Sequence, residues 1–456
     1  MPTQEKTRPG SNDYFGALLD MADEIEARYR SLTPRSKALF DRAGAVFPGG
    51  FTRDAILRAP YAPFIASANG TRMHDVDGRT ITDLWFNATS LPVGHAHPEV
   101  VAAAASQLAL GSAYFAPTEH ELALGELLLD RIPCAERIRF TNSGSEAVMM
   151  ALRFARAFRG RSEVVKFEGS YHGSYDDVSW SVAPKLDQIG PAKSPIAAAE
   201  TSGLVCSAGR VSILPYNDAE SLRAYVTQHH DRIAAIIVEP MANRMGLILP
   251  DREFVTEARS LCDRFGIVLI FDEVIAFRVD YGGAQTALGI EPDLVTLGKV
   301  IGGGFPVGAL AGRAQILGHS TPDRTAGRVA HAGTFNGNPM VGAAGHATMS
   351  LLTPEVFARM NELGSYVRAE LRLICERLPL QITGAGSLFK INATMQEIRN
   401  YRDAATANVK WEQVASLALL NDGFMLTPRL AGCVSAVTKQ SEVDAFISAF
   451  KRLVAV

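Results

Sequence analysis

Short apolar runs rich in β-branched residues alternate with helical patterns through the middle of the chain. The runs that qualify as strands are residues 137–141, 163–167, 233–238, 268–271 and 294–297. Strands that alternate with helices predict a mainly parallel sheet covered by helices on both faces. We therefore expect an α/β fold around this sheet.

The pattern changes after Pro339, where long amphipathic helices and a few short strands follow. The last helix begins with a capping pattern at residues 441–444 and has apolar side chains at helical spacing. Near the N-terminus, residues 14–29 have a helical pattern, and residues 70–85 predict a β-hairpin. A second packed unit is therefore expected beside the central sheet.

One connection is unusually long. Residues 182–209 are rich in Ala, Pro, Ser and Gly. Connections of this length inside a compact domain are usually functional. We expect a mobile active-site loop here, in preference to an interface segment.

Length, composition and charge restrict the class of protein. The chain has 456 residues, 47% of them apolar and 20% charged, as in a globular enzyme with more than one packed unit. A net charge of −3 gives no reason to expect nucleic acid or an anionic membrane as a partner. No apolar stretch is long enough to span a bilayer, and the polar N-terminus lacks the apolar core of a signal peptide. We therefore expect a cytoplasmic protein.

The cysteines are odd in number, scattered and without paired spacing. They are Cys134, Cys206, Cys262, Cys375 and Cys433. This usage predicts buried, reduced thiols and neither disulfides nor a metal site.

Two charged residues stand where predicted strands end. Asp272 follows the apolar run 267–271, and Lys299 follows the run 293–298 just before a glycine-rich segment. The carboxyl ends of parallel strands meet at one edge of a sheet, where ligands bind. A lysine that forms a Schiff base and an aspartate that faces a ring nitrogen are what pyridoxal 5′-phosphate (PLP) requires. The pair therefore predicts a PLP site.

A phosphate site is predicted at the start of one helix. Ser143, Gly144 and Ser145 follow the predicted strand 137–141 and begin a helical pattern. Small residues leave backbone N–H groups open, the hydroxyls add donors, and the helix dipole adds partial positive charge. We expect these three residues to bind the cofactor phosphate.

Other candidates for cofactor binding lie at the same edge. Tyr171 or His172, directly after a predicted strand, can lay a flat ring on a planar cofactor. Glu239 ends another strand there. Residues 331–339 supply a second glycine-rich set of hydroxyl and amide donors, which includes Thr334.

Taken in order, these motifs resemble the class III aminotransferases, the branch of fold-type-I PLP enzymes that includes glutamate-1-semialdehyde aminomutase. The motifs are NSGSEA, SYHG, VEP, IFDEV, TLGK and HAGTFNGNP. The resemblance implies a large domain at residues 71–338, whose mainly parallel sheet lies between helices. It also implies a smaller α+β domain formed by residues 1–70 and 339–456.

The resemblance implies roles for five of the candidates. Lys299 bonds the cofactor and then moves a proton of the substrate. Asp272 keeps the pyridine nitrogen protonated, so that the ring accepts electrons. Gly144 and Ser145 hold the phosphate, and Tyr171 covers the ring.

The resemblance also implies the partners. Thr334, in the matching motif, reaches the phosphate bound by the neighbouring subunit, so a homodimer with shared active sites is expected. The other partners are small molecules, an amino acid and a keto acid.

Two arginines are the candidates for substrate binding. Arg53, soon after Gly50, resembles the arginine with which β-amino-acid aminotransferases of this class hold the substrate carboxylate. Arg429 resembles the second arginine of that branch, which serves the keto acid. A planar guanidinium holds a carboxylate through two parallel hydrogen bonds. Arg58 is a rival to Arg53, because aminomutases also have an arginine followed by alanine in this segment.

The favoured interpretation is a PLP-dependent aminotransferase with a ping-pong mechanism. The donor is an amino acid, with a β-amino acid favoured, and the acceptor is a keto acid such as 2-oxoglutarate or pyruvate. The alternative is an aminomutase, from whose usual motif residues 275–278 depart by being one residue shorter. The long segment 182–209 keeps that alternative open. A binding or regulatory module of the same fold is disfavoured, because Lys299 and Asp272 are intact.

Overall fold

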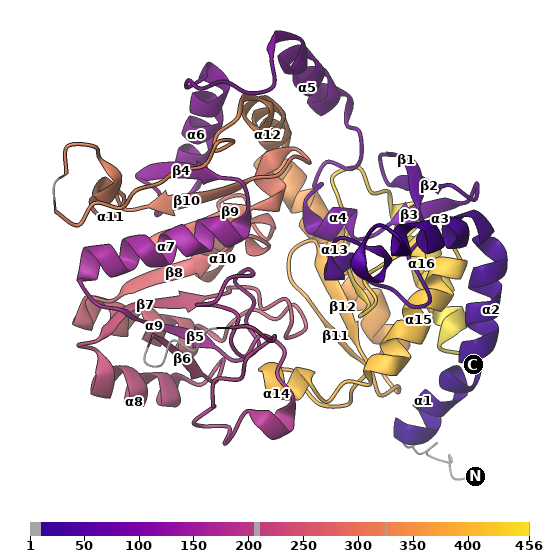
Figure 1. The fold of residues 1–456 in the computed structure, drawn as a ribbon. Helices are drawn as coiled ribbons and strands as arrows, with labels where there is room; N and C mark the ends of the chain where they lie inside the picture. Colours follow the sequence, from indigo (N-terminus) through magenta and orange to yellow (C-terminus); the bar gives the residue numbers. More distant parts are fainter. Residues whose placement is uncertain (1–10, 205–209, 325, 456) are drawn as a thin grey trace.

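The computed structural model describes residues 11–204, 210–324 and 326–455. Its largest sheet has seven strands in the order β4-β10-β9-β8-β7-β5-β6 (Figure 1). These are β4 (Arg137–Thr141), β5 (Glu163–Phe167), β6 (Val211–Leu214), β7 (Ile233–Val238), β8 (Val268–Asp272), β9 (Leu294–Gly298) and β10 (Gly308–Gly312). Strand β10 is antiparallel to both of its neighbours, and the other pairs are parallel. The predicted α/β class and mainly parallel sheet are therefore confirmed.

The predicted strands correspond to β4, β5, β7, β8 and β9, whereas β6 and β10 were not predicted. Strand β10 has the sequence GALAG, which lacks the β-branched residues typical of strands. Its small residues are required where β10 passes the start of a helix. A Cβ at Gly308 would lie 2.0 Å from the backbone oxygen of Ser143.

Helices cover both faces of this sheet, as the side chains of β7 show. Ala235 and Ile237 pack in one core with α7 (Gly144–Arg159). Ile236 and Val238 point the other way, into a core with α8 (Ala219–His229) and α9 (Arg252–Phe265). The remaining helices of this part are α5 (Pro98–Leu110), α6 (Glu119–Arg131), α10 (Ala284–Leu288), α11 (Ala314–Leu317) and α12 (Pro339–Leu351).

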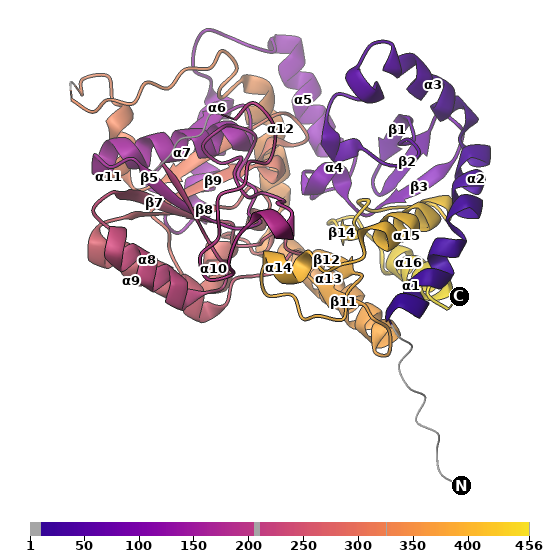
Figure 2. The ribbon, with the colours of Figure 1, turned by 60° about the horizontal axis from the view of Figure 1, so that its bottom comes forward.

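The two ends of the chain form a second layered part beside the large sheet (Figures 1 and 2). Its helices are α1 (Ser11–Asp20), α2 (Ala22–Leu32), α3 (Pro34–Gly44), α13 (Pro354–Cys375), α14 (Tyr401–Ala404), α15 (Val409–Asn421) and α16 (Gln440–Leu453). Tyr29 of α2 and Phe446 of α16 belong to the same buried core. Residues from both ends therefore stabilise one another.

This part contains two small sheets. One has the order β1-β2-β3-β13, with β1 (Ile65–Asn69), β2 (Arg72–Asp75), β3 (Thr80–Asp83) and β13 (Phe424–Met425). The other is β11-β12-β14, with β11 (Gln381–Thr383), β12 (Leu388–Asn392) and β14 (Ala431–Cys433). The predicted hairpin is confirmed as β2 and β3. A domain boundary was predicted at residue 70, and the first sheet contains strands from both sides of this residue. The predicted domain boundaries stay a prediction.

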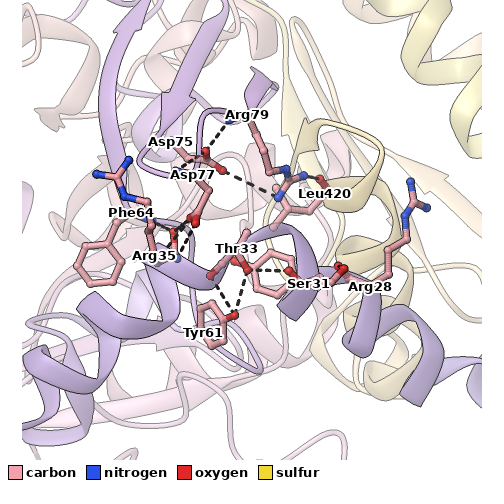
Figure 3. A network of polar contacts seen from close by, with 12 residues as sticks. Arg28, Ser31, Thr33, Arg35, Tyr61, Phe64, Asp75, Asp77, Arg79 and Leu420 are labelled. Carbon is pink, nitrogen blue, oxygen red and sulfur yellow. Dashed lines mark hydrogen bonds and ion pairs between the residues drawn. The ribbon is translucent and has the colours of Figure 1, made fainter.

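The turn of this hairpin fixes the start of α3 (Figure 3). The carboxylate of Asp77 accepts hydrogen bonds from the backbone N–H groups of Arg35 and Ser36, at 2.6 and 3.1 Å. The hydroxyl of Thr33 lies 3.0 Å from that of Tyr61. The Asp77 contacts tie the start of the segment 34–60 to the hairpin, and the Thr33–Tyr61 contact joins the two ends of this segment, which contains Arg53.

The long connection folds back on itself. Trp180 and Ala199 form a β-bridge. The hydroxyl of Tyr401 donates to the backbone oxygen of Pro184 at 2.6 Å, so α14 holds the connection from the terminal part. Residues 205–209, with Cys206, lie outside the described residues, and the mobility predicted for the connection stays a prediction.

The described part of the chain also bears on membrane insertion and on the state of the cysteines. None of its helices is long and apolar enough to cross a bilayer. Cys134, Cys262, Cys375 and Cys433 are buried free thiols, as predicted for them.

Candidate active site

Three neighbouring strands end in charged residues at one side of the large sheet. Asp272 ends β8, Lys299 follows β9, and Glu239 follows β7. Because β7, β8 and β9 are parallel neighbours, their carboxyl ends lie side by side. All three residues line a cavity of about 610 Å³. The structure therefore brings together the residues that the strand pattern placed at this edge.

The carboxylate of Asp272 is fixed by three partners. Its Oδ2 lies 2.8 Å from Nδ1 of His172, and its Oδ1 accepts from the hydroxyl of Thr296 at 3.1 Å and from the backbone N–H of Val274 at 3.2 Å. Burial lowers the pKa of His172, although Asp272 opposes this shift. The ring is therefore neutral at pH 7, with its proton on Nδ1 and directed at the carboxylate. Thr296 was not predicted, although it lies in the TLGK motif.

Lys299 is held in an unusual backbone conformation directly after β9. Its φ angle is 48°, in the left-handed region that non-glycine residues rarely adopt. Burial lowers the pKa of its amine, while Asp272 and Glu239 act in the opposite direction. A lowered pKa increases the fraction of uncharged, nucleophilic amine.

The carboxylate of Glu239 accepts hydrogen bonds from the backbone of two segments beside the cavity. Its Oε2 accepts from the backbone N–H of Tyr171 at 3.2 Å, and its Oε1 accepts from that of Asn243 at 3.0 Å. Burial raises the pKa of Glu239 to about 8. Both Tyr171 and His172 line the cavity, and Glu239 therefore fixes the backbone of the segment that carries them.

The predicted phosphate-binding residues line the same cavity at the start of α7. The hydroxyl of Ser143 caps this helix by accepting from the backbone N–H of Glu146 at 3.2 Å. The hydroxyl of Ser145 accepts from the N–H of Ser174 at 3.3 Å. A Cβ at Gly144 would lie 2.7 Å from a methyl group of Val274, so only glycine fits there without a shift.

The segment that carries Thr334 is tied to this helix start through other residues. Asn336 accepts a hydrogen bond from the side chain of Asn142 at 2.8 Å and lies 3.1 Å from His331. Asn142 lines the cavity and was not singled out from the sequence, although it begins the NSGSEA motif. Thr334 itself is exposed and does not line the cavity within this chain.

The structure places the three candidate arginines differently. Arg53 lines the cavity, and its Nη2 donates to Oδ1 of Asn87 at 3.2 Å. Arg58 is buried, where it donates to the hydroxyl of Ser416 and the backbone oxygen of Leu426.

Arg429 also lies apart from the cavity lining. Its guanidinium pairs with Glu412, which is fully buried and is shared with Lys390 at 3.4 Å. Of the three arginines, the structure therefore brings only Arg53 to the strand ends.

The described residues fit PLP. The start of α7 offers hydroxyl and backbone donors to a phosphate, and Gly144 and Gly173 keep its surroundings free of side chains. Asp272 offers a buried carboxylate to a ring nitrogen, and Lys299 offers an amine with a lowered pKa in the same cavity. These are the groups that would hold the phosphate, the ring and the aldehyde carbon.

Comparisons with known proteins agree with this geometry. The model of the family described as aminotransferase class-III matches residues 58–450. Glutamate-1-semialdehyde 2,1-aminomutase of Methanothermobacter thermautotrophicus is 39% identical over 421 residues, which are 91% of this chain and 97% of that protein.

Solved structures with the same fold include transaminases. An omega-transaminase from Sphaerobacter thermophilus has a TM-score of 0.87 and 41% identity, over 92% of this chain and 97% of that one. A β-phenylalanine aminotransferase from Variovorax paradoxus has a TM-score of 0.87 and 32% identity, over 96% of this chain and 97% of that one.

Proposed function

Because the chain belongs to the class III aminotransferase family and is a PLP-dependent enzyme, we propose that it transfers an amino group from a β-amino acid to a keto acid. The acceptor is a keto acid such as 2-oxoglutarate or pyruvate, and the two half-reactions follow a ping-pong order. The amino group is held by the enzyme between them.

The observation that carries this proposal is the environment of Arg53. Its guanidinium lies at the cavity, and its partner there is the neutral amide of Asn87. A guanidinium next to a neutral acceptor keeps its positive charge available for a substrate carboxylate. Arg58 and Arg429, in contrast, are occupied by Leu426 and Glu412. The similarity to a β-phenylalanine aminotransferase supports the same donor class.

Each residue of the cavity has a defined task in this mechanism. PLP, when bound, supplies a ring that delocalises the negative charge left on the substrate carbon after proton loss. The amine of Lys299 would hold the cofactor, and as a free amine it would take the proton from that substrate carbon. Its lowered pKa increases the fraction of this amine that is uncharged.

Asp272 and the start of α7 hold the cofactor in place. Asp272 keeps a proton on the ring nitrogen, and His172 orients its carboxylate through the 2.8 Å contact. Ser143, Gly144 and Ser145 bind the phosphate, and Tyr171 covers the ring. Glu239 positions Tyr171 through the backbone.

An aminomutase is the second candidate function. The 39% identity to a glutamate-1-semialdehyde 2,1-aminomutase over most of both chains favours it. The two functions differ in one requirement: a transaminase needs an added keto acid for repeated turnover, whereas a mutase uses one substrate for both half-reactions.

The visible absorption of the PLP-loaded protein tests the proposal. A β-amino acid added without keto acid is expected to remove the absorption of lysine-bound PLP in one stoichiometric turnover. Pyruvate or 2-oxoglutarate is then expected to restore it. If only α-amino acids or simple amines remove the absorption, the donor class is wrong. Repeated turnover of glutamate-1-semialdehyde without any keto acid would instead favour the aminomutase.

We also propose a homodimer in which Thr334 reaches the neighbouring active site. Apolar side chains gather at the solvent-exposed end of α5 and after it, where Leu110 is 74% exposed and Phe115 is fully exposed. Phe335, next to Thr334, is 58% exposed. Covering such side chains by a second copy removes apolar area from water. Analytical ultracentrifugation is expected to give a dimer, and a monomer with full activity would contradict this proposal.

A further inference from the structure

Four consecutive residues beside the cavity adopt left-handed backbone conformations. Phe86, Asn87, Ala88 and Thr89, which make up α4 (Phe86–Thr89), have φ angles of 49°, 48°, 56° and 72°. None of them is glycine, and a bulky or β-branched residue in this region is strained. Such strain persists only where the surrounding structure enforces it, and it clusters at functional sites.

Contacts at both ends enforce this turn. At its start, Oδ1 of Asp83 accepts from the backbone N–H groups of Trp85 and Phe86, at 2.8 and 2.9 Å. At its end, the backbone oxygen of Thr89 accepts from Nη1 of Arg278 at 3.0 Å. Arg278 is fully buried, and the ring of Phe86 is fully buried as well. The turn therefore has a fixed position between the large sheet and the terminal part, where Figures 1 and 2 show α4.

The turn presents Asn87 and Ala88 to the cavity that Lys299 and Arg53 also line. The amide of Asn87 is oriented by its own contacts. Its Nδ2 donates to the hydroxyl of Ser90 at 3.1 Å, and its Oδ1 accepts from Nη2 of Arg53 at 3.2 Å. The oxygen of this amide therefore faces the guanidinium.

We propose that Asn87 is a positioning residue for Arg53, held against its guanidinium by the left-handed turn 86–89. This proposal rests on the proposed role of Arg53 in binding the substrate carboxylate. A long exposed arginine has many rotamers, and a fixed acceptor restricts it to those that face the cavity. A neutral acceptor does so without cancelling the charge that the substrate needs.

The charge of the side chain at position 87 should therefore matter more than its size. An aspartate there has the same size, tolerates the left-handed region as asparagine does, and still accepts from Arg53. Its negative charge, however, forms an ion pair that competes with a substrate carboxylate. The pair of Arg429 with Glu412 is an example of such an ion pair elsewhere in this chain.

The test compares two probes on the PLP-loaded enzyme by isothermal titration calorimetry. One is 3-phenylpropanoate, a carboxylate without an amino group to transfer, and the other is its neutral amide. Asn87→Asp is expected to weaken carboxylate binding by roughly 10-fold or more and to leave amide binding within about twofold. Asn87→Gly, which tolerates the backbone conformation, is expected to weaken carboxylate binding by about 3–10-fold.

Two further variants complete the design. Thr89→Gly is the matched control in the same turn, because Thr89 does not line the cavity and its hydroxyl has no hydrogen-bond partner among the described residues, and it is expected to leave both affinities within about twofold. Arg53→Ala is expected to abolish the preference for the carboxylate. With a β-amino acid as donor, the Asn87 variants should raise KM and leave kcat nearly unchanged.

The variants separate a failure of the positioning role of Asn87 from a failure of the proposed function. If Arg53→Ala removes the carboxylate preference but both Asn87 variants retain it, the positioning role is wrong and the proposed function stands. If Arg53→Ala itself changes nothing, both proposals fall. An equal loss in Thr89→Gly would assign the effect to the turn as a whole and overturn the role of Asn87. Thermal unfolding and the absorption of bound PLP verify that each variant is folded and loaded.

Discussion

The Nδ1 atom of His172 lies 2.8 Å from Oδ2 of Asp272, and both side chains are buried at the cavity. An ionised carboxylate only accepts hydrogen bonds, so the proton of this contact belongs to the imidazole. The other ring nitrogen of His172 is buried and has no hydrogen-bond partner among the described residues. A second proton there would be buried without an acceptor, which agrees with the lowered pKa of His172.

We predict that His172 makes the stability of the protein depend on pH in the acid range. The ordinary pKa of 6.5 is lowered by burial in the folded state, so the unfolded chain binds a proton that the folded protein excludes. Stability is unaffected by this group above pH 6.5 and falls as the pH drops below it. The variant His172→Asn, which keeps a donor for Asp272, is expected to show a smaller fall in urea midpoint between pH 7 and 5. An unchanged slope would contradict the assigned neutral ring.

Replacing Gly144 with alanine is predicted to weaken PLP binding. The Cβ added at the start of α7 would lie 2.7 Å from a methyl group of Val274, so the helix start or Val274 must shift. We expect the Kd for PLP, measured by fluorescence titration, to rise about 10-fold, since displaced N–H donors lose a charge-assisted hydrogen bond of about 1.5 kcal/mol or more. Gly318→Ala is the control, because its Cβ would meet nothing within 4 Å. Equal Kd values for both variants would argue against a phosphate at this helix.

The alternation of short apolar runs with helical patterns was sufficient to predict the fold class and the strand ends that carry Asp272 and Lys299. Such positions are predictable because a buried parallel strand is a continuous apolar run, and its end marks the edge where ligands bind. Strand β10 was missed for the opposite reason. Its two glycines are required by close approaches to other backbone, Gly308 to Ser143 and Gly312 to Asp293, and the strand therefore lacks the usual residues of high β-propensity.

Side chains that act through tertiary contacts were not predictable from spacing. Asn87 contacts Arg53, although the two residues are 34 positions apart in the sequence. Asn87 lies in a turn whose left-handed backbone conformation could not be predicted from its residue types. The partner of Arg429 is Glu412, which lies within a helical pattern that predicts only packing. Local sequence therefore predicts the residue types of a site. Tertiary contacts determine which arginine can bind a ligand.

Arg429 provides a prediction about stability. The buried Glu412 has two cationic partners, Arg429 and Lys390, and removing one leaves its charge less compensated. We expect Arg429→Ala to lower the free energy of unfolding by about 1–3 kcal/mol, because Lys390 and the partial exposure of Arg429 limit the loss.

The same variant tests the keto-acid role predicted for Arg429. That role requires the guanidinium to leave Glu412 when the acceptor binds. A KM for 2-oxoglutarate that rises at least about 10-fold, with the KM of the donor unchanged, would support it. A loss of stability with both KM values unchanged would assign Arg429 to the structure alone.

Glu239 is predicted to have the reverse pH dependence of His172. Burial raises its pKa from 4.5 to about 8, so between these values the folded protein binds a proton that the unfolded chain has lost. Its contribution to stability is therefore complete below pH 4.5, declines as the pH rises and is lost above pH 8. The total change is at most about 5 kcal/mol. Urea denaturation of cofactor-free Glu239→Gln between pH 5 and 9 should therefore show a flatter profile than the parent protein.

The control for this experiment is Glu253→Gln, at an exposed position of α9. It is expected to keep the slope of the parent protein. The amide of Glu239→Gln can accept from only one of the backbone N–H groups of Tyr171 and Asn243, so some stability is lost at every pH. The slope, and not the absolute value, is therefore the decisive quantity. A slope equal to that of the parent protein would mean that Glu239 is ionised in the folded state and that its two backbone donors, with Lys299, outweigh its burial.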